Sequence, residues 1–316
     1  MHLQLTFAAG GYDFVRPLAD GTIKPDGIDL MVLSGMGSGE RHHRMGHGQE
    51  FDLCEFNAAA YLAAHDRDYP WLALPVFLHR RFRHGFVFVN PQRGITSPRD
   101  LAGKRLGGPT FLAAGNVWMR GILEEHYGAP HHDITWFVER EDAVAFTPPP
   151  GLRYERVPEG VRAEAMMLDG KLDGLLSPDL PQAFLKGDPR IARLFAANKE
   201  EEIAYYKKTS IFPIMHVTLI KREIVERHPW VPNTLMNSIR PRKSPTSASL
   251  TRAMSRSPGC ATRSRSRSPC LAPTRGSSGS PRRTAPTSQR SSAIAYSKAS
   301  CARNALSRSC SSMQDG

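Results

Sequence analysis

The stretch PVFLHRRFRHGFVFVN, residues 75–90, has two apolar ends and a strongly basic middle. Its ends are rich in β-branched and aromatic residues, which favour a pleated, partly buried strand. The middle holds five basic groups, namely His79, Arg80, Arg81, Arg83 and His84. Because side chains alternate along a strand, Arg81 and Arg83 are expected on one face and His84 on the other. The stretch therefore predicts a pair of strands that presents cationic groups at a defined place in the fold.

Strand-like and helix-like segments alternate on both sides of this stretch. Strands are expected over 3–9, 27–33, 51–56, 72–78, 85–90, 104–110, 134–140, 152–158, 171–177 and 214–220. Helices are expected over 57–66, 115–127, 160–170 and 223–238. Such alternation is typical of α/β proteins, so we predict an α/β architecture with largely parallel sheets.

The positive charge of the chain is concentrated in its C-terminal part. The 316 residues contain 42 Lys and Arg against 30 Asp and Glu, a net charge of +12. Residues 239–316 hold 15 of these basic groups and a single acid, Asp315. The remaining 27 basic and 29 acidic groups give residues 1–238 a charge of −2. The body of the protein therefore lacks the basic surface that a nucleic-acid partner would require.

The basic tail is unlike the rest of the chain. Residues 239–316 contain no Glu, Phe or Trp, and their apolar residues follow no period of 2 or 3.6. A segment of this composition cannot bury enough apolar surface to offset its ordering entropy, so we predict disorder. RSRSRSP (263–269) superficially resembles the arginine–serine tracts of RNA-processing proteins. We favour instead an out-of-frame translation of a GC-rich gene, because the break is abrupt and interrupts an amphipathic helical pattern.

The cysteines and the N-terminal segment indicate the cellular compartment of the protein. Cys54 alone lies in the body, whereas Cys260, Cys270, Cys301 and Cys310 lie in the tail. No pair has CxxC or zinc-ligand spacing, which argues against a disulfide framework and a structural zinc site. The start MHLQLTFAAGG lacks the cationic region of a signal peptide. No segment approaches the roughly 20 apolar residues of a membrane span, so we expect a cytoplasmic protein.

Several ordered motifs carry a resemblance to a known family. They are GIDL (27–30), FDLCEF (51–56), FRHGFVFVN (82–90), SPRDLAGKRLGGPT (97–110), GNVWMRGILEEHYG (115–128), LDGKLDGLLSP (168–178) and YYKKTSIFPIMHV (205–217). In this order they resemble the 4,5-dihydroxyphthalate decarboxylases, which are similar in fold to type 2 periplasmic substrate-binding proteins. The resemblance covers residues 1 to about 236. It implies two lobes joined by two crossover strands, with a ligand cleft between the lobes.

The resemblance also implies a division of the chain. Lobe one would comprise 1–82 plus 213–238 and would be incomplete, lobe two would comprise 83–212, and the tail would comprise 239–316. The first crossover then falls within residues 75–90. Arginine forks match carboxylates bidentately, and a phthalate carries two carboxylates on adjacent carbons. We therefore predict that Arg81 and Arg83 bind the substrate, although pairing with surface acids is the alternative for any single arginine.

The chemistry that the resemblance implies requires a proton donor. Loss of CO2 from an aromatic ring needs a proton at the carbon that carried the carboxylate, and a para hydroxyl to accept electrons. Imidazole suits this role near neutral pH, so His84 and His216, one on each crossover, are predicted to be catalytic. Glu55 ends an expected strand where α/β proteins collect functional groups, and it is a third catalytic candidate. Each histidine has a core role as its alternative, and Glu55 has helix capping.

Further substrate-binding residues are predicted around the cleft. Thr110 ends an expected strand, and Asn116 opens a helix whose free N–H groups suit a carboxylate. Trp118 is expected to stack on the ring or to pack under the helix. Arg120 would complete the anion clamp or bind a neighbouring helix, and Tyr12 would hydrogen-bond a phenolic oxygen.

Other signals are weaker. GMGSGE (35–40) lacks the third glycine of a dinucleotide-binding loop. His43 and His47 have metal-pair spacing, but no further ligand completes a site, so a solvated helix face is favoured. Decarboxylation of an electron-rich ring can proceed by acid–base chemistry alone. We therefore expect no cofactor, with a divalent metal as the open alternative.

Three classes of function remain at this stage. The first is a non-oxidative decarboxylase of a dihydroxyphthalate-like aromatic dicarboxylate. The second is the substrate-binding protein of an ABC-type uptake system, which would use the same cleft without chemistry. The third is an RNA-associated protein that acts through the tail, which the charge of the body disfavours. We expect a small aromatic dicarboxylate as partner, no nucleic acid and no membrane, and leave the oligomeric state open.

The composition break yields a prediction at the level of the gene. Another reading frame downstream of about codon 236 should encode an amphipathic, acid-containing helical segment. Loss of about ten buried apolar side chains, at roughly 1.5–3 kcal/mol each, would exceed a typical net stability of about 5–15 kcal/mol. Protein carrying the restored segment should therefore be soluble and active, and the 316-residue chain poorly soluble or inactive, when yields and turnover are compared. If neither alternative frame encodes such a segment, the tail is genuine.

Overall fold

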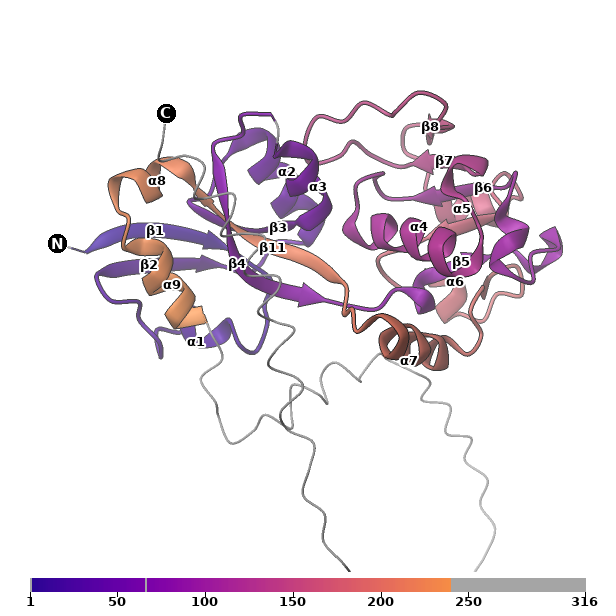
Figure 1. Cartoon of the computed structure of the whole chain (residues 1–316). Coiled ribbons are helices and arrows are strands. Elements are labelled where there is room, and N and C mark those ends of the chain that lie inside the picture. Colours follow the sequence, from indigo (N-terminus) through magenta and orange to yellow (C-terminus); the bar gives the residue numbers. More distant parts are fainter. Residues whose placement is uncertain (1, 66, 240–316) are drawn as a thin grey trace, which may run out of the picture. The chain divides into compact units, whose positions relative to one another are not determined.

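The computed structural model describes residues 2–65 and 67–239. The predicted disorder of the tail, and the frameshift that would explain it, fall on residues 240–316 and lie outside the described part. Two β-sheets organise the described chain, each covered by helices (Figure 1). The predicted α/β architecture is confirmed. The predicted lobe limits at residues 82 and 213 stay a prediction.

The first sheet has five strands. Their order is β2 (Ile28–Leu33), β1 (Leu3–Ala8), β3 (Leu53–Asn57), β11 (Ile214–Lys221) and β4 (Trp71–Arg80). The strands β2, β1 and β3 are parallel, whereas β11 runs antiparallel to both of its neighbours. The predicted, largely parallel arrangement therefore holds for β2, β1, β3 and β4, and the sheet is mixed because β11 returns from the second sheet in the opposite direction.

The second sheet has six short strands. Their order is β10 (Ala192–Arg193), β5 (Val87–Val89), β9 (Gly174–Leu176), β6 (Arg105–Gly108), β7 (Thr135–Val138) and β8 (Tyr154–Arg156). The four strands from β9 to β8 are parallel, and β5 and β10 are antiparallel additions at one edge.

Helices cover both faces of the first sheet. Successive residues of a strand point to opposite faces, so Leu53 and Cys54 belong to different apolar clusters. The face of Cys54 is covered by α2 (Ser38–Gly48) and α3 (Ala58–Ala64). The opposite face is covered by α1 (Arg16–Ala19), α8 (Arg222–Arg227) and α9 (Val231–Ile239). Both helical layers are visible in Figure 1.

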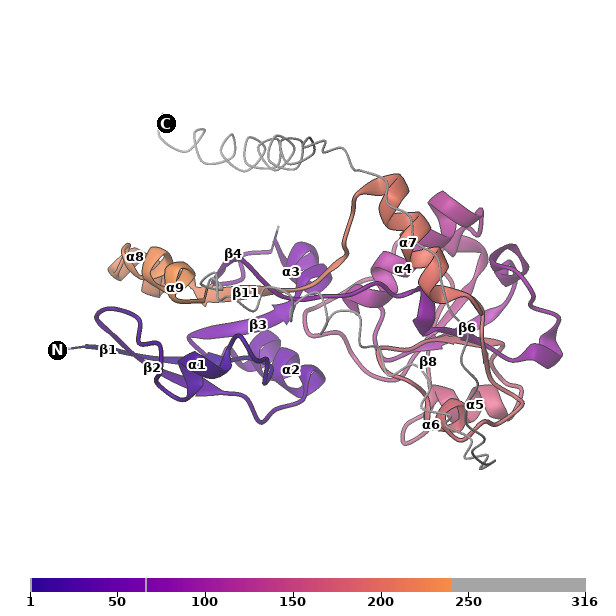
Figure 2. The same cartoon turned by 90° about the horizontal axis from the view of Figure 1, so that it is seen from below.

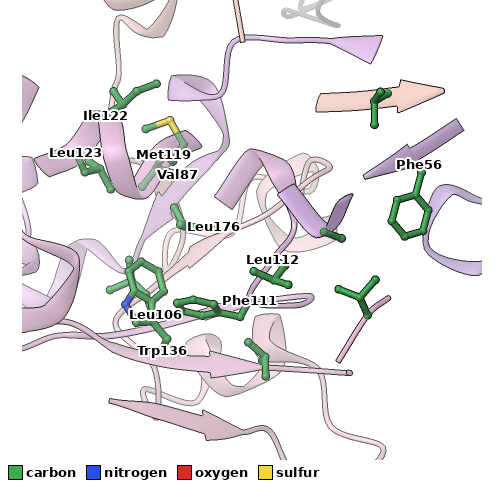
Figure 3. Close-up of a cluster of buried hydrophobic side chains, with 14 of the residues drawn as sticks. Phe56, Val87, Leu106, Phe111, Leu112, Met119, Ile122, Leu123, Trp136 and Leu176 are labelled. Atoms are coloured by element: carbon green, nitrogen blue, oxygen red, sulfur yellow. The ribbon is translucent and has the colours of Figure 1, made fainter. Parts of the chain in front are cut away.

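The second sheet is also packed on both faces. The long helix α4 (Ala114–Tyr127) lies on one side, and α5 (Ala163–Leu168) and α6 (Gln182–Leu185) lie on the other (Figure 2). Figure 3 shows the contact beneath α4, where Met119, Ile122 and Leu123 meet strand residues Val87, Leu106 and Leu176. Burial of each such side chain stabilises the fold by about 1.5–3 kcal/mol.

Two chain segments connect the sheets. Residues 81–86 lead from β4 to β5, and residues 210–213 lead from α7 (Asn198–Thr209) back to β11. The two lobes are also in direct contact: Asn57 Nδ2 donates to the carbonyl of Leu112 at 2.8 Å, and Trp118 Nε1 donates to that of Ile214 at 2.8 Å. The site described below lies at this junction.

Three local predictions are wrong. The strand expected over 85–90 begins only at Val87, because the chain first forms a 3-10 turn over His84–Phe86. A Cβ at Gly85 would lie 2.8 Å from Asn198 Nδ2, so this turn is held close against α7. The helix expected over 223–238 is two helices, since Pro229 excludes the preceding residue from helical geometry. The helix α7 was not predicted.

None of the helices in the described part of the chain is long and apolar enough to cross a membrane.

Candidate active site

A cavity of about 610 Å³ lies between residues of the two lobes. Lobe one lines it with residues of α2, β4 and β11, and lobe two lines it with the start of α4 and the loops after β6, β7 and β9. Its lining includes five arginines and three acids, namely Arg44, Arg81, Arg83, Arg140, Arg156, Glu40, Glu141 and Asp179. The wall therefore has an excess of positive charge, which suits an anionic ligand.

A fully buried carboxylate, Glu55, lies behind this cavity. Its Oε1 accepts hydrogen bonds from Tyr12 Oη at 2.6 Å and His216 Nδ1 at 2.5 Å. Its Oε2 accepts from the backbone N–H of Gly10 at 2.7 Å and from Arg41 Nη2 at 2.7 Å. Burying an ionised carboxylate is costly unless it is paired and hydrogen-bonded, and these four donors meet that requirement.

The protonation of this network follows from its geometry. Burial by itself would raise the pKa of Glu55, but the hydrogen bond from His216 and the charges of His216 and Arg41 lower it below its usual range. Burial and the neighbouring carboxylate raise the pKa of Tyr12, so its hydroxyl remains a donor. Because ionised Glu55 can only accept, His216 must carry a proton on Nδ1. Its Nε2 is then the atom free to exchange a proton at the cavity.

The sheet register explains how this network forms. Residues of three neighbouring strands meet here, because β11 lies between β3 and β4. His216 is paired with Asn57 of β3 on one side and with His79 of β4 on the other. A register shift beside His216 interrupts the regular pairing with β4. Irregular pairing of this kind commonly re-aims a side chain next to a functional site.

Two more histidines flank His216. The ring of His42, on α2, lies 4.7 Å from that of His216 with an interplanar angle of 87°. The ring of His79 lies 4.8 Å away at 72°. All three residues line the cavity. They form a row of imidazoles on one wall.

Arg81 and Arg83 line the cavity as predicted from the sequence. The guanidinium of Arg81 lies 4.3 Å from the ring centre of Phe86, and that of Arg83 lies 5.2 Å from it. Arg83 is 6% exposed, and its Nη1 donates to the carbonyl of Pro178 at 2.8 Å. Within residues 2–65 and 67–239, neither guanidinium has a carboxylate within ion-pair distance. Burial and the charge of Arg81 lower the pKa of Arg83 to about 10, so it stays cationic near neutral pH.

The N-terminus of α4 faces the same arginines. Its first turn borders the cavity through Ala114, Gly115 and Asn116, and no side chain caps it. Thr110 also lines the cavity, and its carbonyl accepts a hydrogen bond from Asn116 Nδ2 at 3.4 Å. The free N–H groups and positive dipole of a helix start favour an anion. Thr110 and Asn116 therefore line the cavity, and their role in substrate binding stays a prediction.

Five other residues predicted from the sequence do not line the cavity. His84 is completely buried beside Tyr127, Phe195 and Tyr205, because the turn at 84–86 directs it away from the cavity. Trp118 packs under α4 and reaches β11 instead of stacking on a ligand.

The guanidinium of Arg120 is buried over the ring of Phe111, 3.8 Å from its centre. The hydroxyl of Tyr12 donates to Glu55 Oε1 at 2.6 Å. Glu55 itself supports His216 from behind and does not cap α3, whose cap is Asn57. These residues therefore lie behind the residues that line the cavity.

Arg41 and His42 were not predicted as site residues. The histidines of α2 with recognisable metal-pair spacing, His43 and His47, lie on its exposed face. Met45 is the sole large apolar residue of this helix, and residues 41 and 42 share its buried face at helical spacing. Their helical spacing from Met45 was the sequence feature that could have identified Arg41 and His42 as buried residues.

The arrangement does not favour a metal ion. Glu55, His79 and His216 have potential ligand atoms within 4.8 Å of one another. A carboxylate offers about four lone-pair sites, and here four protein donors occupy them. Arg41 also neutralises the charge that would attract a cation. The residues fit a hydrogen-bonded network better than a metal site.

Comparisons with known proteins connect this geometry to a family. No family model matches the chain. It is 35% identical over 243 residues to 4,5-dihydroxyphthalate decarboxylase of Comamonas testosteroni, covering 75% of this chain and 73% of that protein. It is 31% identical over 215 residues to the protein of the same name in Pseudomonas putida, covering 66% and 83%. The chain belongs to the 4,5-dihydroxyphthalate decarboxylase family.

The predicted family membership is thus confirmed. Among solved structures, the chain is similar to the periplasmic aliphatic sulphonate-binding protein SsuA of Escherichia coli, with a TM-score of 0.48 and 13% identity. That match covers 80% of this chain and 74% of SsuA.

The contact between α4 and Arg83 can be tested with two glycines. A Cβ at Gly115 would lie 2.8 Å from Arg83 Nε, whereas one at Gly121 meets nothing within 4 Å. Gly115→Ala should displace Arg83 and weaken phthalate binding by roughly 5- to 50-fold, the scale of one charge-assisted hydrogen bond. Gly121→Ala should leave binding unchanged and stabilise the helix by up to about 1 kcal/mol. Calorimetry and thermal unfolding measure both effects, and equal affinities in the two variants would contradict this role of Gly115.

Proposed function

We propose that this protein is a non-oxidative decarboxylase that converts 4,5-dihydroxyphthalate, or a closely similar aromatic dicarboxylate, to protocatechuate and CO2. One observation carries the proposal: two guanidinium groups that have no carboxylate partner among residues 2–65 and 67–239 share a cavity with an imidazole backed by a buried carboxylate. Membership of the 4,5-dihydroxyphthalate decarboxylase family supports the same reaction.

In this proposal the carboxylates bind at Arg81, Arg83 and the start of α4. The guanidinium planes are fixed by Phe86, so little conformational entropy is lost when a carboxylate binds. Partial burial strengthens the attraction, because the surrounding dielectric constant is low. The leaving carboxylate is thus bound at these groups, and its negative charge passes into the ring when CO2 departs.

Proton transfer is assigned to His216. Nε2–H of its imidazolium protonates the ring carbon that bears the leaving carboxylate, and the ionised para oxygen becomes the carbonyl of a dienone. The bond to the carboxylate then breaks, CO2 leaves, and the electron pair returns through the ring to the oxygen. One proton is taken up overall. Ionised Glu55 stabilises the imidazolium and fixes its orientation, as a buried carboxylate does in other acid–base sites.

Arg41 and Tyr12 act on this step through Glu55. Arg41 is 2% exposed and holds Glu55 Oε2, while Tyr12 holds Oε1 beside His216. Both keep the carboxylate ionised and fixed in position. The proposal uses no cofactor, since acid–base chemistry supplies each proton transfer.

Turnover tests the proposal directly. The protein with the restored segment, or the full chain if no alternative frame encodes one, should release CO2 from 4,5-dihydroxyphthalate and form protocatechuate. His216→Gln should lower kcat by roughly 100- to 10,000-fold with little change in binding, as for loss of a general acid. CO2 release and chromatography measure the reaction, and calorimetry measures binding. Binding without turnover in the unsubstituted protein would favour the uptake receptor instead.

A second test concerns the anion clamp. Arg83→Met keeps the length of the side chain but removes its charge, so phthalate binding should weaken by about 1.5–3 kcal/mol. Arg80→Met is the matched control, because Arg80 is exposed, lies three residues away and does not line the cavity. Calorimetric affinities that are equal in the two variants would remove Arg83 from the binding site.

A further inference from the structure

Few buried polar side-chain atoms in residues 2–65 and 67–239 lack a hydrogen-bond partner. They are His42 Nε2, Trp71 Nε1, His79 Nδ1 and both ring nitrogens of His84. Native proteins leave few such atoms, and each one calls for an explanation. Of these residues, only His42 and His79 line the cavity, and neither has a role in the proton transfer assigned to His216.

The three imidazoles each have one nitrogen that cannot reach a ligand. These nitrogens are Nε2 of His42 and Nδ1 of His79, which are buried, and Nδ1 of His216, which is bound to Glu55. The other nitrogen of each ring is not among the buried atoms, and it makes no hydrogen bond within the described residues. Since all three residues line the cavity, each ring presents one nitrogen to it.

His42 and His79 are neutral near physiological pH. Burial, followed by the positive charges of His216 and Arg83, lowers the pKa of His79 to about 3. Burial, with His216 and Arg41, likewise lowers the pKa of His42 well below its usual value. The one nitrogen that each neutral ring presents can donate or accept a hydrogen bond according to its tautomer, and a hydroxyl group can pair with either. The carboxylate groups are better matched by the arginines.

The upper limit on the separation of the two outer rings leaves room for a pair of hydroxyl groups. Centroid separations of 4.7 Å and 4.8 Å from His216 place His42 and His79 at most about 9.5 Å apart, the sum of the two. Two adjacent ring hydroxyls, each with one hydrogen bond of about 2.8 Å, span roughly 8 Å from one nitrogen to the other. A ring with a single hydroxyl would leave one imidazole without a partner.

We propose that His42 and His79 are substrate-binding residues that recognise two adjacent hydroxyl groups on the aromatic ring. This inference rests on the proposed function and adds to it the residues that distinguish a dihydroxylated from a monohydroxylated acid. A site that hydrogen-bonds a hydroxyl discriminates strongly against an analogue that lacks it, because its buried polar groups are then left unpaired.

Binding of products tests this inference without requiring turnover. Calorimetry on the full chain compares protocatechuate, which has two adjacent hydroxyls, with 4-hydroxybenzoate, which has one. The unsubstituted protein should bind protocatechuate at least about 10-fold more tightly. His79→Phe and His42→Phe keep a ring against His216 but cannot hydrogen-bond. The variant that loses the partner of the hydroxyl absent from 4-hydroxybenzoate should reduce that preference by roughly 5- to 10-fold. The other variant should weaken the binding of both ligands by about the same factor.

His65→Phe is the control, because His65 is an exposed histidine after α3 that does not line the cavity. It should retain the full preference for protocatechuate. If substitution of buried His42 prevents folding, the partly buried His79 still decides the question. Unchanged affinities of folded His79→Phe for both ligands, or no preference in the unsubstituted protein, would overturn the inference.

The same data separate this inference from the proposed function. Decarboxylation with an unchanged preference in the variants would refute the role of His42 and His79 and leave the decarboxylase intact. A histidine-dependent preference without any CO2 release would support hydroxyl recognition and refute the decarboxylase.

Discussion

The buried carboxylate of Glu55 is the constraint on which the site depends. Four donors surround it, from Gly10, Tyr12, Arg41 and His216, and these residues come from distant parts of the chain. An ionised carboxylate without them would cost several kcal/mol to bury. The folded state therefore fixes the end of β1, the buried face of α2 and the centre of β11 together. The placement of the proposed catalytic groups and the stability of lobe one therefore both depend on the charge of Glu55.

This constraint explains the polarity of the cavity. Ionised Glu55 fixes the tautomer of His216 and directs Nε2 to the ligand, while His42 and His79 stay neutral beside it. Arg81 and Arg83, which are fixed over Phe86, contribute positively charged groups to the same cavity. A ligand with acid groups at one end and hydroxyl groups at the other matches both sets. The dihydroxyphthalates have this arrangement, which agrees with the family of the chain.

Much of this site was predictable from the sequence, but unevenly. Arg81 and Arg83 could be predicted because a cluster of arginines between apolar strands is unusual, and both line the cavity. His84 stands in the same motif, yet a 3-10 turn directs it into an aromatic cluster. That turn could not be predicted from local sequence, since it depends on the close approach of Gly85 to α7. His42 was missed because the exposed histidines of the same helix attracted attention.

The sequence by itself determined the alternation of strands and helices, the family and the composition break near residue 239. These depend on local periodicity and on ordered motifs, which are properties of contiguous residues. Tertiary structure alone decided which side chains meet. Glu55 and His216 are 161 positions apart, and only the antiparallel pairing of β11 with β3 brings them to 2.5 Å. Register between distant strands is set by the packing of whole lobes, and a shift of one residue would turn His216 to the other face of the sheet.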